Sequence, residues 1–233
     1  MPNRQTVTIE RRQRLFLDGM KQSILMARIA YSRLIVACQM HVQFRESMVP
    51  QKVEIANELL SQTWLIVDSS NRLRRLAISM PGLQRTDAVK AMLHGSAEAW
   101  PLRNYIQHLD TDLMSGGDSP LWGTLRWTEA TQHEQVIRVA VHYYVAGPVA
   151  AGPVDLPFQV GRGPFRHPID DFTLAAAGTQ MNITSLVESL QHFGERLELA
   201  LDNLNWPNEN ERIIVHVPME RVDTEVRESR RLE

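Results

Sequence analysis

The first half of the chain carries apolar residues at spacings of three and four, the pattern of amphipathic helices. Between residues 14 and 46 these positions share one helical face: Leu15, Phe16, Met20, Ile24, Ala27, Tyr31, Leu34, Ile35, Cys38 and Val42. A second stripe begins after Pro50, a residue that suits a first helical turn because it lacks an N–H. It ends at Pro81-Gly82. The pattern therefore predicts two long helices.

A third helix follows and is interrupted. Thr86 can cap its start, and Gly95 and Pro101 break its continuation. Because the residue before a proline is pushed out of helical geometry, we expect a break near Trp100. Pro101 would restart a helix that carries Arg103 and His108, and Ser115-Gly116-Gly117 would close it.

The hydrophobic period then changes to two, which indicates strands at 121–128 and 136–145. Residues 146–170, with four glycines and five prolines, read as a long loop, and 171–176 as a short strand. Ser185 with Glu188 forms the pattern of a capping box, which predicts the start of a last helix. Alternating residues at 213–217 predict a final strand.

These elements predict a mainly α fold: an up-and-down bundle of four main helices with a small antiparallel β insertion between the third and last core helices. With 233 residues, 43% of them hydrophobic, one sizeable core is expected. We expect a single domain over 1–233, with a β-rich insertion at 118–180 and a charged tail at 220–233.

Composition limits the function classes. The net charge of −2 provides no global basic field, although a neutral protein can still carry a local basic pocket. The single cysteine, Cys38, excludes an internal disulfide and a cysteine-based zinc cluster, and we expect it to be a small buried residue. Residues 1–13 are polar and lack the apolar core of a signal peptide. We therefore expect a cytoplasmic protein without a membrane segment.

One helical segment carries candidate chemistry. Arg103 is a permanent cation whose donors fit phosphate, and His108 is a side chain suited to proton transfer near neutral pH. Five residues along a helix rise about 7.5 Å and turn about 140°, so the two side chains flank one wide face. Asn104 and Asp112 lie four residues before and after His108, where Asp112 can fix the imidazole tautomer. Asp110 lies further round the helix.

The segment Leu102-Arg103-Asn104-x3-His108-x-Asp110 resembles the signature of HEPN domains. The resemblance implies a helical bundle that acts as a metal-independent endoribonuclease, without cofactors, in a homodimer that brings two copies of the motif together. His108 would be a general base or acid on the RNA 2′-hydroxyl, Arg103 would stabilise the phosphorane, and Asn104 would position groups around them. Such proteins act in stress, phage defence or toxin–antitoxin systems, where an antitoxin is the partner.

Several alternatives remain open at this level. The bundle can instead be a non-catalytic dimerisation and binding module of unknown ligand, with Arg103 and His108 bonded at a dimer contact. A basic rim is not evident in the sequence near the motif. We expect His142 to have a neighbourhood poor in carboxylates, and we expect no metal site. The aromatic residues of the predicted strands suit packing of a sheet on helices, or base stacking if one sheet face is open: Trp122, Trp127, Tyr143 and Tyr144.

Overall fold

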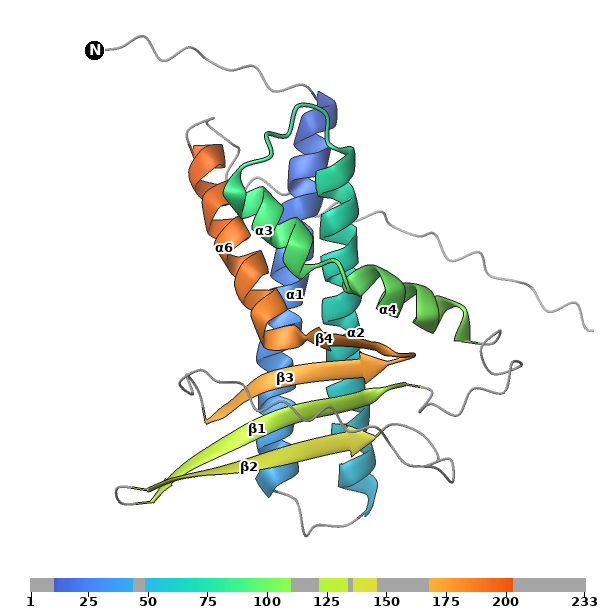
Figure 1. Ribbon diagram of the computed structural model, residues 1–233, viewed down its shortest axis with the longest axis vertical. Helices are drawn as coiled ribbons and strands as arrows, with labels where there is room; N and C mark the ends of the chain where they lie inside the picture. The colour runs from blue at the N-terminus through green and yellow to red at the C-terminus, as the bar shows by residue number, and fades with distance from the viewer. Residues whose placement is uncertain (1–10, 44–48, 110–121, 134–135, 146–167, 203–233) are drawn as a thin grey trace, which may run out of the picture.

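The computed structural model describes residues 11–43, 49–109, 122–133, 136–145 and 168–202. Its helices are α1 (Arg11–Gln43), α2 (Val49–Ser79), α3 (Asp87–Gly95), α4 (Ala99–Gln107) and α6 (Ile183–Asp202). α1 and α2 run antiparallel along much of their length, and α6 lies beside α1 (Figure 1). α3 crosses α6, whereas α4 contacts α2 and projects to one side.

Four antiparallel strands form one sheet in the order β2-β1-β3-β4. They are β1 (Thr124–His133), β2 (Val136–Val145), β3 (Ile169–Ala176) and β4 (Thr179–Asn182). The sheet crosses the lower parts of α1 and α2 in Figure 1. β1 extends five residues beyond the predicted strand, and β4 was not predicted. The predicted strand at 213–217, most of the loop at 146–170 and the tail at 220–233 lie outside the described residues.

The mainly helical class and the small antiparallel sheet are confirmed, but a four-helix up-and-down bundle is not. The reason lies between residues 95 and 99, where the backbone leaves helical geometry and α4 takes a different direction from α3. α4 begins at Ala99, so Trp100 is helical and Pro101 lies in the first turn, where a missing N–H is tolerated. The expected break is real but lies a few residues before Trp100.

The helix caps show one correct and one wrong prediction. The Thr86 hydroxyl accepts a hydrogen bond from the Val89 N–H at 3.4 Å, as expected for the start of α3. α6 begins at Ile183 instead of Ser185. The Asn182 side-chain oxygen accepts a bond from the Ser185 N–H at 2.7 Å, so Asn182 caps the helix and the capping box from Ser185 to Glu188 was wrong.

Aromatic residues join the sheet to the helices. Tyr31 of α1 meets Phe172 of β3 edge to face at 5.6 Å between ring centroids, and His41 meets Trp127 of β1 in the same manner. Trp127 is fully buried and stacks on His142 with the rings 5.2 Å apart. The packing interpretation therefore holds for Trp127. The expected lack of carboxylates near His142 was wrong, because its Nε2 lies 2.8 Å from a Glu129 oxygen.

By length and composition, α1 is also apolar enough to cross a membrane, a test that core helices pass as well. Its packed face contributes nine buried residues. A second side exposes five large apolar residues: Leu15, Leu25, Ile29, Val36 and Met40. The helix is thus apolar on two sides, which explains its high hydropathy.

Tyr31 should make stability fall at high pH. Burial is the main reason that the pKa of Tyr31 is raised to about 12. An unfolded tyrosine ionises near pH 10, so the unfolded chain loses this proton first and the free energy of unfolding falls as pH rises from about 10 to about 12. The contribution of the Tyr31 pKa shift to the free energy of unfolding is fully present below pH 10. Urea unfolding at several pH values measures it.

Tyr31→Phe is the matched control, because it keeps the ring and removes only the hydroxyl and its bond to Thr184 at 3.3 Å. The variant should lose about 1 kcal/mol near neutral pH and show a flatter decline above pH 10. The pKa of Tyr144 is also raised by burial, but this residue is present in both proteins. Equal slopes for parent and variant would contradict the assignment.

Candidate functional site on α2 and α4

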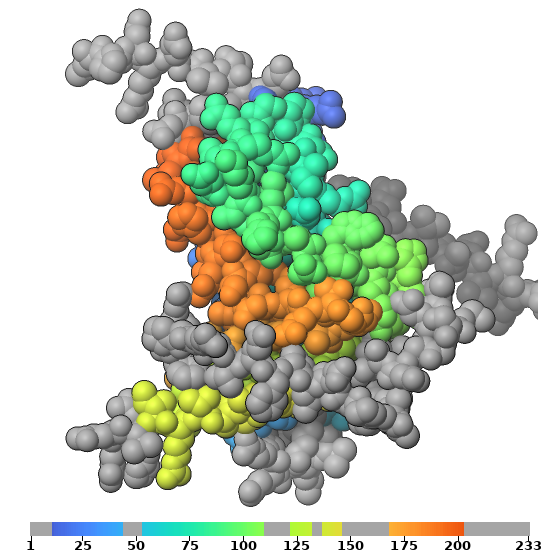
Figure 2. Space-filling view, in the orientation of Figure 1, coloured from blue at the N-terminus to red at the C-terminus, as the bar shows by residue number. Residues whose placement is uncertain are grey.

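The helix that carries the predicted motif is anchored by its apolar side. Ala99 and Leu102 of α4 are fully buried, and α4 packs on α2. Leu102 directly precedes Arg103, so burial of the leucine fixes where the arginine leaves the helix. In the space-filling view α4 lies at the molecular surface (Figure 2). The motif is therefore on a helix that packs against α2, and it lies near solvent.

Arg103 is held by two polar groups. Its Nε donates to an Asp68 carboxylate oxygen of α2 at 2.7 Å, and its Nη1 donates to the Gln107 side-chain oxygen at 2.9 Å. The Arg103 side chain is 25% exposed and that of Asp68 is 27% exposed. The guanidinium is thus oriented, with part of its surface in solvent, before any ligand binds.

Asp68 forms ion pairs with two arginines. Its second oxygen lies 2.7 Å from Nη2 of Arg72, one turn further along α2. Two guanidinium groups share one carboxylate, so this cluster of Asp68, Arg72 and Arg103 carries a net positive charge. A local positive site exists here although the chain as a whole is slightly acidic.

His108 is the C-cap of α4, and its backbone N–H donates to the carbonyl oxygens of Asn104 and Tyr105. Its side chain and that of Asn104 are exposed. Within the described ranges, no hydrogen bond joins the side chains of Arg103 and His108. Arg103 is directed to α2, while His108 lies about 140° further round the helix axis.

The remaining predicted site residues, Asp110 and Asp112, lie outside the described residues. The structure adds Asp68 and Arg72, which the sequence reasoning missed. A signal for Arg72 was present in the arginine-rich run at 72–75. Asp68 has no comparable signal, because its role depends on a helix 35 residues later in the chain.

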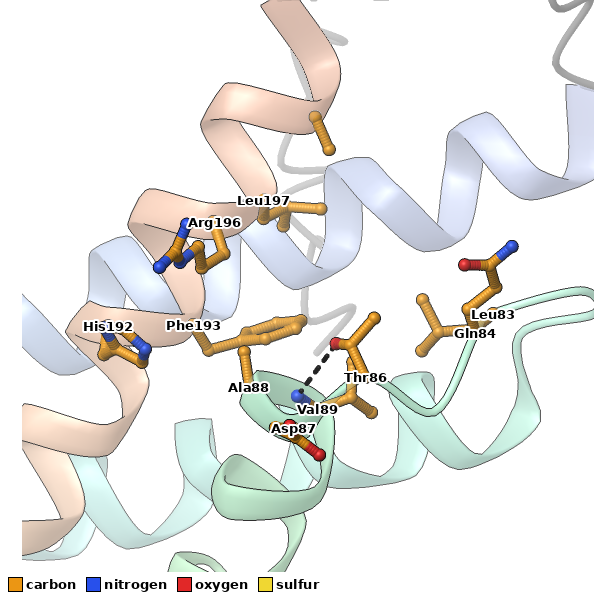
Figure 3. A pocket seen from close by; sticks show the side chains of 11 residues that line it. Leu83, Gln84, Thr86, Asp87, Ala88, Val89, His192, Phe193, Arg196 and Leu197 are labelled. Carbon is orange, nitrogen blue, oxygen red and sulfur yellow. Dashed lines mark hydrogen bonds between the residues drawn. The ribbon is translucent and has the colours of Figure 1, made fainter.

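Other candidate sites are separate from this cluster. A cavity of about 580 Å³ lies where Leu83 and Val89 face Phe193 and Leu197 of α6 (Figure 3). Cys38 is buried as expected, and burial raises the pKa of its thiol above the usual range. Over the part of the chain that the structure describes, no group of three or more His, Cys, Asp or Glu residues is placed to hold a metal ion.

Comparison with known proteins adds no identification. No protein family, curated protein or solved structure matches the chain. Inference about function therefore depends on the geometry of α2 and α4.

Replacing Asp68 with alanine should loosen α4. The variant loses both ion pairs, and we expect the free energy of unfolding to fall by about 1 kcal/mol, a small value because the pair is a quarter exposed. Hydrogen exchange at residues 99–107 should become faster. Lys90→Gln is the control, since the Lys90–Asp87 pair lies at the surface and its loss should leave the free energy of unfolding nearly unchanged. Unchanged exchange in α4 of the Asp68 variant would contradict this role.

Proposed function

We propose that this protein is a metal-independent endoribonuclease of the HEPN-like type, acting on RNA in a stress or defence role in the cytoplasm. The observation that carries the proposal is the oriented, partly exposed guanidinium of Arg103 on a helix that ends in an exposed imidazole, that of His108. In this proposal α1, α2, α6 and the α3–α4 pair are the bundle of such a domain. No membrane segment is required.

The chemistry needs only these two groups and the RNA. His108 would take the proton of a 2′-hydroxyl as its oxygen attacks the adjacent phosphorus. The donors of Arg103 that Asp68 and Gln107 leave free would stabilise the extra negative charge on the phosphorane. The imidazolium would then give its proton to the departing 5′-oxygen. The products are a 2′,3′-cyclic phosphate and a 5′-hydroxyl.

The divergence of the two side chains supports a site made by two copies. Arg103 is held against α2, and His108 is exposed about 140° away around α4. A homodimer that places the α4 helices of two copies on either side of one cleft would let the Arg103 of one copy face the His108 of the other. An antitoxin that covers α4 would block such a site, which fits a toxin–antitoxin role.

The ion pair with Asp68 favours a second candidate, a non-catalytic dimerisation and binding module of unknown ligand. A carboxylate that already binds Nε of Arg103 competes with a phosphate for the guanidinium. In that case the cluster of Asp68, Arg72 and Arg103 fixes α4 for partner binding, and His108 has no role in proton transfer.

RNA cleavage in the presence of EDTA distinguishes the candidates. The purified parent should cut mixed RNA and leave 2′,3′-cyclic phosphate ends. His108→Ala should reduce the rate about 10²- to 10⁴-fold by removing the proton carrier. Arg103→Ala should reduce it about 10²- to 10³-fold by removing charge stabilisation. His94→Ala, which removes an exposed histidine of α3, is the matched control and should cleave like the parent.

Equal traces of cleavage in all four proteins would indicate a contaminating nuclease and contradict the enzymatic proposal. A folded dimer that does not cleave RNA would support the binding module instead.

A further inference from the structure

An exposed tryptophan lies beside the cluster of Asp68, Arg72 and Arg103. Trp100 of α4 is 51% exposed, although tryptophan buries more apolar surface than any other side chain when it is covered. It lies three residues before Arg103 and four before Asn104. Residues at these spacings are neighbours on a helix, with Cβ atoms about 5–6 Å apart. The indole, the guanidinium and the amide therefore share one side of α4.

A second exposed tryptophan is hydrogen-bonded to α2 through its backbone. Trp122, 44% exposed, precedes β1, and its carbonyl oxygen accepts a bond from Nε1 of Trp64 at 3.2 Å. Trp64 is one helical turn before Asp68. The backbone of Trp122 therefore lies beside the turn of α2 that precedes Asp68.

The positive charge continues along α2. Arg72 and Arg75 lie four and seven residues after Asp68, on the same side of the helix, and both are exposed. Arg74 points elsewhere, since it donates to the Leu93 carbonyl oxygen at 3.1 Å. Arg72 and Arg103 pair with Asp68, and Arg75 adds a further positive charge about one turn beyond Arg72 on the same side of α2.

We propose that Trp100 stacks on an unpaired base next to the phosphate that Arg103 binds, so that the site selects single-stranded RNA. This inference rests on the proposed function, because it takes RNA as the substrate of the Arg103 and His108 site. Aromatic side chains that alternate with a cationic track are the usual means of binding a single strand. A base inside a duplex is already stacked on its neighbours and cannot lie on Trp100.

Exposed tryptophan and arginine also occur at the centres of protein interfaces. The excess of positive charge beside Trp100 favours a polyanion over a protein partner. The oligomeric state of a Trp100 variant separates the two, since an interface residue would change assembly and a base-stacking residue would not.

Binding is measured with a single-stranded RNA that is 2′-O-methylated throughout, so that cleavage through the 2′-hydroxyl is blocked. Fluorescence anisotropy with Trp100→Ala should show binding about 5- to 100-fold weaker than the parent. Trp100→Phe should recover most of the affinity, and Val36→Ala, which shortens an exposed side chain of α1, should bind like the parent. A duplex of the same length should bind more weakly, with no effect of Trp100→Ala.

Salt dependence separates stacking from charge. Trp100→Ala should leave the slope of log affinity against log salt unchanged. Arg75→Gln should reduce that slope by about 0.7, the value for one lost phosphate contact on a single strand.

Each outcome of these experiments either supports or overturns the role of Trp100. Equal binding by parent and Trp100→Ala, a changed oligomeric state, or no RNA binding by the parent would overturn the inference. If the parent cleaves ordinary RNA while Trp100→Ala binds as the parent does, the nuclease proposal stands and this inference fails. Trp100-dependent binding without cleavage supports this inference and removes the nuclease proposal.

Discussion

The geometry of the candidate site depends on the ion pairs that the Asp68 carboxylate forms with Arg72 and Arg103. This carboxylate joins the motif helix α4 to the long helix α2 and sets the direction of the Arg103 guanidinium. Burial of Leu102 fixes the helix, and the Asp68 carboxylate, together with the Gln107 side chain, orients the Arg103 guanidinium. Both partners keep about a quarter of their side-chain surface exposed, which lowers the desolvation cost relative to a fully buried pair. The arrangement leaves a positive surface that faces solvent.

The long helices were predictable because their apolar positions repeat over more than 30 residues, as the bounds of α1 and α2 show. The four-residue strand β4 has no comparable pattern, and it forms by pairing with β3. The predicted start of α6 was wrong for a related reason. Asn182 and Ser185 are both good capping residues, and the end of β4 at Asn182 decides between them. That decision depends on tertiary structure, which local sequence does not encode.

The candidate site was predictable only in part. The sequence places Arg103, Asn104 and His108 on one helix, but it does not reveal that Asp68 binds the arginine across 35 residues. Long-range ion pairs leave no periodic signal. Trp100 entered the sequence reasoning only as the expected position of a break, whereas the structure shows it as an exposed side chain next to Arg103. A basic residue that the sequence near the motif lacks is supplied by α2, since Arg72 shares Asp68 with Arg103.

The central claim is that Arg103 of one copy and His108 of another make one site, and complementation between two inactive chains tests it most directly. Arg103→Ala and His108→Ala chains are mixed under conditions of subunit exchange and assayed for RNA cleavage in EDTA. About half of the dimers then contain one chain of each variant. Such a dimer has one complete site out of two, so the mixture should recover about a quarter of the parental activity. A mixture that forms mixed dimers and stays as inactive as its components would contradict the claim.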